Sequence, residues 1–158
     1  VDNVPLSEHL AADTLSQFPR LDPDRQQARV SQLLAAAGFQ ETMALSFTRP
    51  ALNDALRATL PLKDVALLNP LSEELSVMRQ TLLFSVLETL VYNLNRRQRD
   101  LKIFEFGKGY GQAEDGRYVE SPRLALALTG NRQAESWQQP AQPVQFHDVA
   151  TIVQNVLK

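Results

Sequence analysis

Three glutamates are the side chains of this sequence best suited to acid–base chemistry. Glu73 and Glu74 are adjacent at a junction ahead of a predicted helix, where acids are typically solvated or stabilise the helix dipole. Glu105 differs because it lies on an otherwise apolar face of a predicted strand. A carboxylate on such a face requires a cationic partner. Arg79 is the candidate partner, and we predict a structural role for this pair.

Metal binding and nucleophilic catalysis have little support. His9 and His147 are the only histidines, and no second ligand stands at a metal-binding spacing from either. The serines lack a Gly-x-Ser-x-Gly elbow. The chain has no cysteine, which excludes disulfides, thiol catalysis and thiolate-bound zinc. We therefore predict no catalytic, cofactor-binding or metal-binding residue in this chain.

Two stretches invite an interpretation as nucleotide or nucleic-acid sites. The glycine-rich run GKGYG, residues 107–111, follows a predicted strand, but its spacing differs from G-x-G-x-x-G and no helix follows it. A twisted strand end or a bulge is the favoured interpretation. A basic run, Arg96, Arg97, Arg99 and Lys102, ends a leucine-rich helix. Because cations there complement the helix dipole, that interpretation is favoured over RNA contact.

Length and charge place these residues in one globular domain. A chain of 158 residues can bury a sizeable core without disulfides or metal. The net charge of −2 gives no electrostatic argument for nucleic acid or an anionic membrane. No apolar run approaches the roughly 20 residues that span a bilayer. The sequence begins at Val1 and stops at Lys158 inside a predicted helix, so we expect a piece of a longer protein.

Hydrophobic periodicity and capping residues predict the element order. Residues 1–20 are expected to form a linker or arm that follows an upstream domain, and residues 21–158 an incomplete core domain. Within it we expect helices at 23–37, 50–60, 80–98 and from 146 onward, strands at 40–47, 64–69, 101–111 and 122–130, and a polar loop at 113–121. The fold class is α+β, with a mostly antiparallel sheet and helices packed on it.

Three of these elements carry more detailed expectations. Apolar residues cover about half of the wheel of helix 80–98, so this helix is expected to pack against two neighbours. Asn93 lies inside that arc, and its amide is expected to bond a neighbouring loop or another chain. In strand 40–47, Met43, Leu45 and Phe47 point to one side. Strand 122–130 is apolar on both faces, which is typical of a central strand.

Several stretches resemble one known family. The run NPLSEELSVMRQTLLFSVLETLVYNLNRR fits a pattern N-P-L-S-x-E-x-S-x-M-R followed by a leucine-rich helix ending N-x-N-R, and IFEFGKGY supplies the F-E-x-G strand. GFQETMALSF, LTGNRQAESW and VQFHDVATIVQNVL match further segments in the same order. Together they resemble the bacterial phenylalanyl-tRNA synthetase beta subunit, over nearly the whole chain.

The resemblance implies an antiparallel sheet flanked by helices, as in class II aminoacyl-tRNA synthetases, in a catalytic-like but inactive domain. If Glu105 matches the class II strand glutamate, the ATP-binding arginine position is Ile103, which cannot bind a phosphate. The implied role is packing against the alpha subunit in an alpha-two beta-two enzyme that charges tRNA in the cytoplasm. The residues assigned to structure or interface are Asn69, Arg79, Asn93, Asn95 and Glu105.

The same resemblance assigns cofactors to the whole enzyme and none to this chain. ATP and magnesium are expected for the complete enzyme, with the metal-bearing acidic segment upstream of Val1. Direct contact between tRNA and this domain stays open. The alternative hypothesis is a free-standing class II-type adenylate-forming enzyme with a reduced active site, which would catalyse amino-acid-dependent pyrophosphate exchange through Glu105.

Overall fold

The computed structural model describes residues 22–60 and 62–157, so the predicted arm at 1–20 and His9 lie outside the described residues. The elements in chain order are α1 (Pro23–Ala36), β1 (Gln40–Glu41), β2 (Phe47–Thr48), α2 (Pro50–Ala55), a 3₁₀ helix η1 (Glu73–Leu75), β3 (Val77–Met78), α3 (Leu83–Leu94), β4 (Leu101–Gln112), β5 (Tyr118–Thr129), β6 (Asn131–Gln133), β7 (Gln142–Pro143) and α4 (Phe146–Val156).

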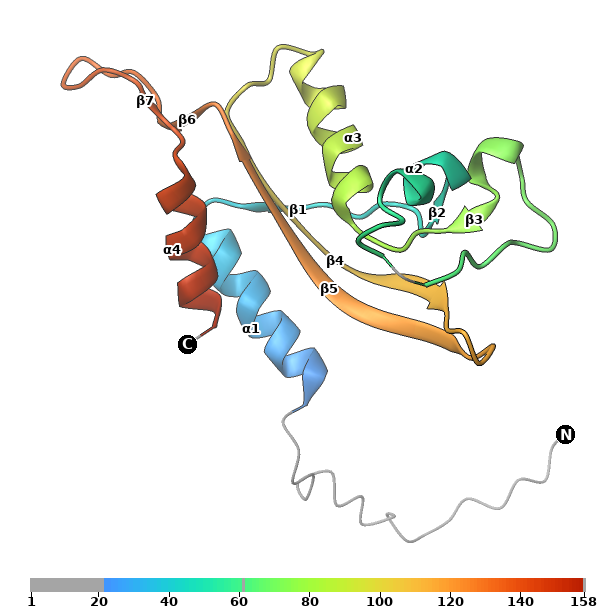
Figure 1. Cartoon of the computed structure of the whole chain (residues 1–158). Coiled ribbons are helices and arrows are strands. Elements are labelled where there is room, and N and C mark those ends of the chain that lie inside the picture. Colours follow the sequence, from blue (N-terminus) through green and yellow to red (C-terminus); the bar gives the residue numbers. More distant parts are fainter. Residues whose placement is uncertain (1–21, 61, 158) are drawn as a thin grey trace, which may run out of the picture.

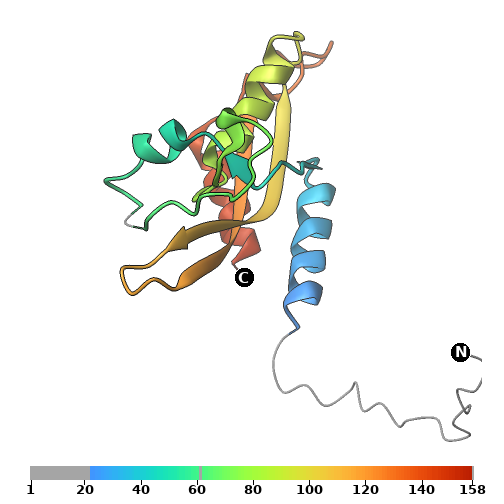
Figure 2. The ribbon, with the colours of Figure 1, turned by 90° about the vertical axis from the view of Figure 1, so that its right-hand side faces the viewer.

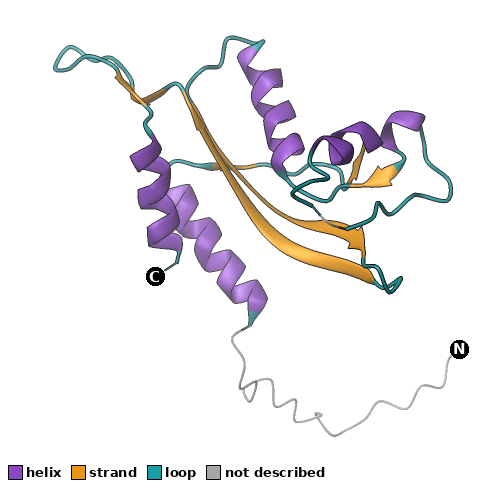
Figure 3. Ribbon diagram, viewed as in Figure 1, coloured by secondary structure: helices purple, strands orange, loops and turns teal. Residues whose placement is uncertain are grey.

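The fold is built on a long antiparallel hairpin, β4–β5, which dominates the strand content (Figure 3). Its register is unbroken from Leu101 opposite Thr129 to Gln112 opposite Tyr118. The short strand β1 adds parallel to β4, so the sheet order is β1-β4-β5. Two small antiparallel pairs, β2–β3 and β6–β7, complete the strands of the described residues. The α+β class with a mainly antiparallel sheet is confirmed.

Helices cover the two faces of this hairpin. In Figure 1, α1 and α4 lie on one side of the hairpin and α3 lies on the other. The α1 side holds the main core, in which Leu34, Phe39 and Phe104 are buried and three alternate leucines of β5 pack against them: Leu124, Leu126 and Leu128. On the opposite face Ile103 of β4 is buried, as are Leu82 and Val86 at the start of α3. Because side chains alternate along β4, one face of this strand packs in the core on the α1 side and the other packs against α3.

The ends of α1 follow from its sequence. The Asp22 carboxylate accepts a hydrogen bond from the Asp24 backbone N–H at 3.0 Å, and Pro23 occupies the first turn. Gly38 follows the helix with φ +85°, a conformation that favours glycine. The predicted beginning and end of this helix are confirmed.

Several expected boundaries are wrong. Predicted strand 40–47 divides into β1 and β2, because residues 42–46 leave β4 to reach β3. Residues 64–69 contribute an isolated bridge in place of a strand. The loop predicted at 113–121 is only a tight turn, since β5 begins at Tyr118. β5 is also an edge strand of the described sheet and not a central one.

The glycine-rich run lies at the end of β4, as predicted, but it is not a bulge. Gly107, Gly109 and Gly111 all pair in register with β5. A Cβ atom at Gly107 would lie 2.4 Å from Arg79 Nη2, and one at Gly109 would lie 2.4 Å from the Gln80 backbone carbonyl oxygen. Glycine is therefore required because the segment before α3 crosses directly over β4.

Candidate functional site

A buried ion pair joins this crossing segment to the sheet. Arg79 Nη1 lies 2.6 Å from Glu105 Oε1, and the two residues are only 5% and 1% exposed. Ser85 Oγ donates to the second carboxylate oxygen of Glu105 at 2.9 Å. Arg79 Nε also donates to the Lys108 carbonyl oxygen at 3.3 Å. Arg79 is thus the partner of Glu105, as the sequence suggested, and both carboxylate oxygens accept a hydrogen bond.

The backbone of Arg79 belongs to the same arrangement. Its N–H donates to the Ser46 carbonyl oxygen at 2.9 Å, and its own carbonyl accepts from the Tyr110 N–H at 2.8 Å. The residue therefore links the 42–46 segment to β4 through its main chain, while its side chain fills the space above Gly107. This geometry holds a packed junction together and gives each oxygen of the buried Glu105 carboxylate a partner within the fold.

A second buried network lies beside the first, and sequence reasoning missed it. Asn53 Nδ2 donates to Asp64 Oδ1 at 2.7 Å and to the Met78 carbonyl oxygen at 3.1 Å. Gln80 Nε2 donates to the same Asp64 oxygen at 2.7 Å, and Arg57 Nη2 lies 3.0 Å from Asp64 Oδ2. Asn53 and Gln80 are buried. The network fixes α2 and the crossing segment to each other.

The three predicted asparagines do not join either network. Asn69 is exposed, on the rim of an apolar recess of about 180 Å³. Asn93 is half-buried, and its amide donates to the Thr89 carbonyl oxygen at 2.8 Å. That bond lies within α3, so the expected bond to a neighbouring loop is not found among the described residues, and a bond to another chain stays a prediction. Asn95 is exposed just after the helix.

The apolar arc of α3 is divided between a buried and an exposed half. Leu82 and Val86 are buried against the sheet. The residues of the exposed half recur at spacings of three and four, which places them in one stripe: Leu83, Leu87, Val91 and Leu94. The described residues therefore supply one of the two neighbours that so wide an arc predicts.

A second group of exposed apolar side chains forms a ridge across a recess from α3. Met43 and Leu45 are 92% and 65% exposed, and Phe47 is also exposed. A recess of about 230 Å³ lies between Leu45 and Phe47 on one side and Phe84 of α3 on the other. Beyond Phe47, two further leucines are almost fully exposed, Leu68 and Leu71. We call the α3 stripe and this ridge together the apolar face.

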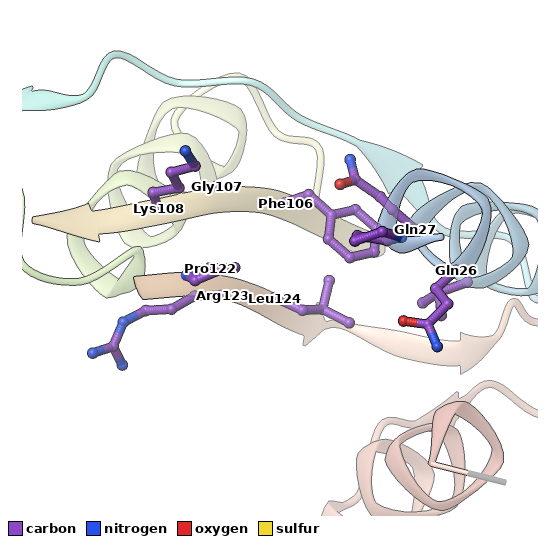
Figure 4. A pocket seen from close by; sticks show the side chains of 10 residues that line it. Gln26, Gln27, Phe106, Gly107, Lys108, Pro122, Arg123 and Leu124 are labelled. Atoms are coloured by element: carbon purple, nitrogen blue, oxygen red, sulfur yellow. The ribbon is translucent and has the colours of Figure 1, made fainter. Parts of the chain in front are cut away.

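A groove of about 470 Å³ opens on the other side of the hairpin (Figure 4). Gln26 and Gln27 of α1 lie along one wall, and Phe106 and Leu124 of the strands form the floor. Of its two cations, Lys108 is paired with Glu120 at 2.7 Å, and this hydrogen bond raises the pKa of Lys108. The lining residues offer neither a nucleophile nor a pair of carboxylates for acid–base chemistry.

Neither a cluster of metal ligands nor a free polar side chain at Ile103 or Glu105 is found among the described residues. Within residues 22–60 and 62–157, no three His, Asp or Glu side chains come together as ligands. Ile103 is 3% exposed and apolar, and Glu105 is fully engaged by Arg79 and Ser85. His147 lies at the start of α4, beside the Phe146 ring. None of the helices in the described ranges has the length and apolar character needed to cross a bilayer.

The antiparallel sheet with helices on both faces has the fold of a class II aminoacyl-tRNA synthetase, as a solved structure shows. A pyrrolysyl-tRNA synthetase structure from Desulfitobacterium hafniense superposes with a TM-score of 0.58 over 91% of this chain and 46% of that chain, at 19% identity. This similarity establishes the fold alone.

The model of the phenylalanyl-tRNA synthetase beta chain CLM domain matches residues 12–158, and the chain belongs to this family. Phenylalanine–tRNA ligase beta subunits are similar to it: one from Bacteroides thetaiotaomicron is 35% identical over 99% of this chain, and one from Geobacter sulfurreducens is 39% identical over 84%. The chain spans 20% and 17% of the lengths of these relatives.

Proposed function

We propose that this chain is a non-catalytic assembly domain of a phenylalanine–tRNA ligase beta subunit, and that its apolar face packs against the alpha subunit. The observation that carries the proposal is the exposure of the apolar face. Solvent-exposed apolar patches on monomers rarely exceed a few hundred Å². An exposed stripe of aliphatic residues on α3, with a second exposed apolar ridge across a recess from that helix, is typical of a surface that a partner covers.

The buried networks support the non-catalytic part of the proposal. A class II enzyme that binds ATP on this strand needs polar side chains free to contact phosphate. Here Ile103 is apolar, and Glu105 is held by Arg79 and Ser85. We assign ATP and magnesium to other parts of the complete enzyme, which works with tRNA in the cytoplasm. The alternative, a free-standing adenylate-forming enzyme, predicts pyrophosphate exchange by this chain alone.

Co-purification with the alpha subunit tests the assembly role. Leu87→Glu combined with Val91→Glu places two charges in the centre of the stripe, and we expect it to abolish the complex because charges there cannot be desolvated. Both residues are already exposed in the isolated chain, so folding should be retained. The matched control is Gln27→Glu with Gln32→Glu, at exposed positions on α1.

If the two double variants form the complex with the alpha subunit equally well, the apolar face is not the surface that binds this subunit. Phenylalanine-dependent pyrophosphate exchange by the chain without the alpha subunit, lost in Glu105→Gln, would favour the alternative.

A further inference from the structure

A set of unpaired cations lies at the end of α3, away from the networks described above. Arg96, Arg97, Arg99 and Lys102 form no ion pair with any carboxylate of the described residues. Of the ten other cations in the described residues, seven form an ion pair: Arg25, Arg49, Arg57, Arg79, Lys108, Arg117 and Arg132. The three that do not, Arg29, Lys63 and Arg123, are far apart in the sequence, whereas the four at the end of α3 fall within seven residues. Because the whole chain carries a net charge of −2, this local excess does not follow from a basic composition.

Arg97 occupies a backbone conformation that favours glycine. Its φ is +66°, the one positive value at a non-glycine residue among the described residues. The Gln98 N–H bonds the Asn93 carbonyl at 3.1 Å and the Arg97 N–H bonds the Leu94 carbonyl at 2.9 Å, the pattern of a helix end that glycine usually terminates. The exposed Arg97 side chain forms no hydrogen bond or ion pair within the described residues that would offset this strain, which indicates a role outside the chain.

The helix dipole explains only the first of the four cations. Arg96 Nη1 donates to the Tyr92 carbonyl oxygen at 3.0 Å, and its guanidinium stacks 3.4 Å from the centroid of the Tyr92 ring. It therefore serves the helix end. Arg97, Arg99 and Lys102 follow the last turn, beyond which the dipole effect is weak.

The loop that bears these cations is held in place. Thr129 Oγ1 donates to the Arg99 carbonyl oxygen at 2.8 Å, and the Asn131 N–H donates to Asp100 Oδ1 at 2.8 Å. Lys102 lines an adjoining recess of about 290 Å³ together with Asn131, Arg132 and Asp100. The backbone of the loop is therefore anchored, while the exposed Arg97 and Arg99 side chains have no partner within the described residues and can adjust to the spacing of phosphates.

We propose that Arg97, Arg99 and Lys102 bind phosphates of the tRNA backbone. The proposal rests on the proposed function, in which this chain is part of a tRNA-charging enzyme. A polyanion fits the surface because the cations have no carboxylate partners, whereas the apolar face described above suits a protein. The hairpin β6–β7 lies at the same end of the molecule as the end of α3 (Figures 1 and 2), and it carries Trp137, 92% exposed, which can stack on an unpaired base.

The test measures tRNA affinity against salt concentration, using the full-length beta subunit assembled with its alpha partner. In Arg97→Gln/Arg99→Gln/Lys102→Gln, loss of two to three phosphate contacts should lower the slope of log K against log salt by roughly 2, and the affinity about 10- to 100-fold. The control, Arg25→Gln/Arg29→Gln/Arg117→Gln, makes the same change in charge at exposed sites elsewhere.

Each other outcome overturns a defined part of the account. An unchanged slope in the triple variant, with normal tRNA binding by the wild type, overturns the phosphate site and leaves the proposed function intact. If the triple variant loses the complex with the alpha subunit and the control variant keeps it, the phosphate site is overturned, and these cations contact a protein. A wild-type assembly that binds no tRNA overturns the proposed function itself.

A single substitution separates strain from charge. Arg97→Gly relieves the left-handed backbone, so it should raise Tm while weakening tRNA binding. A lower Tm, or tRNA affinity equal to that of the wild type, would contradict the role given to this residue.

Discussion

Loss of the Arg79 side chain would leave the buried charge of Glu105 without a partner. Arg79→Ala would bury the Glu105 carboxylate, 1% exposed, without its cation. We expect the free energy of unfolding to fall by about 3–5 kcal/mol, which chemical denaturation would measure. The exposed pair Arg117–Asp115 provides the control, because solvent screens its charges and Arg117→Ala should leave the free energy of unfolding nearly unchanged.

A double substitution distinguishes the charge from the volume of that side chain. Arg79→Met with Glu105→Leu removes both charges and keeps apolar bulk, so it should recover most of the stability lost by Arg79→Ala. If the double variant is as unstable as the single one, then the hydrogen bonds of Arg79 to backbone groups stabilise this junction more than its charge does.

The crossing of the 62–82 segment over β4 depends on the absence of one side chain. Gly109→Ala would place a Cβ atom 2.4 Å from the Gln80 carbonyl oxygen, a backbone atom that cannot rotate away. We expect a loss of stability of about 1–3 kcal/mol or more, with lower thermal stability in a calorimetric scan. Gly116→Ala is the comparison: its φ is +85° but a Cβ atom there meets nothing, so only conformational strain of about 1 kcal/mol should appear.

The start of α4 gives stability that depends on pH. The pKa of Asp148 is lowered, first by the hydrogen bond from the Gln145 N–H and also by Arg132. Since the folded pKa lies below the unfolded one, the ionised carboxylate stabilises the fold above the unfolded value, about 3.9, and this contribution disappears as pH falls through the folded pKa.

Thermal scans at several pH values would measure this contribution. Wild type should melt above Asp148→Ala at pH 7, and the two should converge as the pH falls through the lowered folded pKa of Asp148. Glu114→Ala, on the turn after β4, controls for the loss of one negative charge. A difference in Tm that persists unchanged at low pH would mean that the helix cap acts independently of ionisation.

Helices α1, α3 and α4 and the long hairpin could be predicted because their signals are local. Asp22 and Gly38 mark the ends of α1, and apolar periodicity marks α3. The network around Asp64 could not be predicted, since its partners Asn53 and Gln80 are 11 and 16 residues away and no pattern relates them. The Arg79–Glu105 pair was suggested only because a carboxylate on an apolar face demands a cation.

Apolar and smaller side chains alternate along residues 42–47. This alternation predicts which residues share a face of the segment, but not which face the rest of the chain covers. Here the more apolar face is the one left uncovered, with Met43 and Leu45 exposed and Ala44 half-buried. A sequence contains no direct record of a partner, so the exposed ridge became apparent only when the fold was assembled.

At the scale of the whole molecule, two surfaces lie on different parts of one scaffold. The apolar face runs along α3 to the ridge at Phe47, whereas the unpaired cations lie beyond the C-terminal end of α3. Mutations in one should leave the other unaffected, because sites that share no partners usually act additively. Each surface groups exposed side chains that the fold itself does not require.

Sedimentation velocity of this chain mixed with the purified alpha subunit tests the central claim most directly. We expect a stable heterocomplex for the wild type, and separate boundaries for the two components when the chain carries Leu87→Glu and Val91→Glu. A wild-type chain that sediments as a monodisperse species beside the free alpha subunit, at concentrations well above micromolar, would contradict the assembly role.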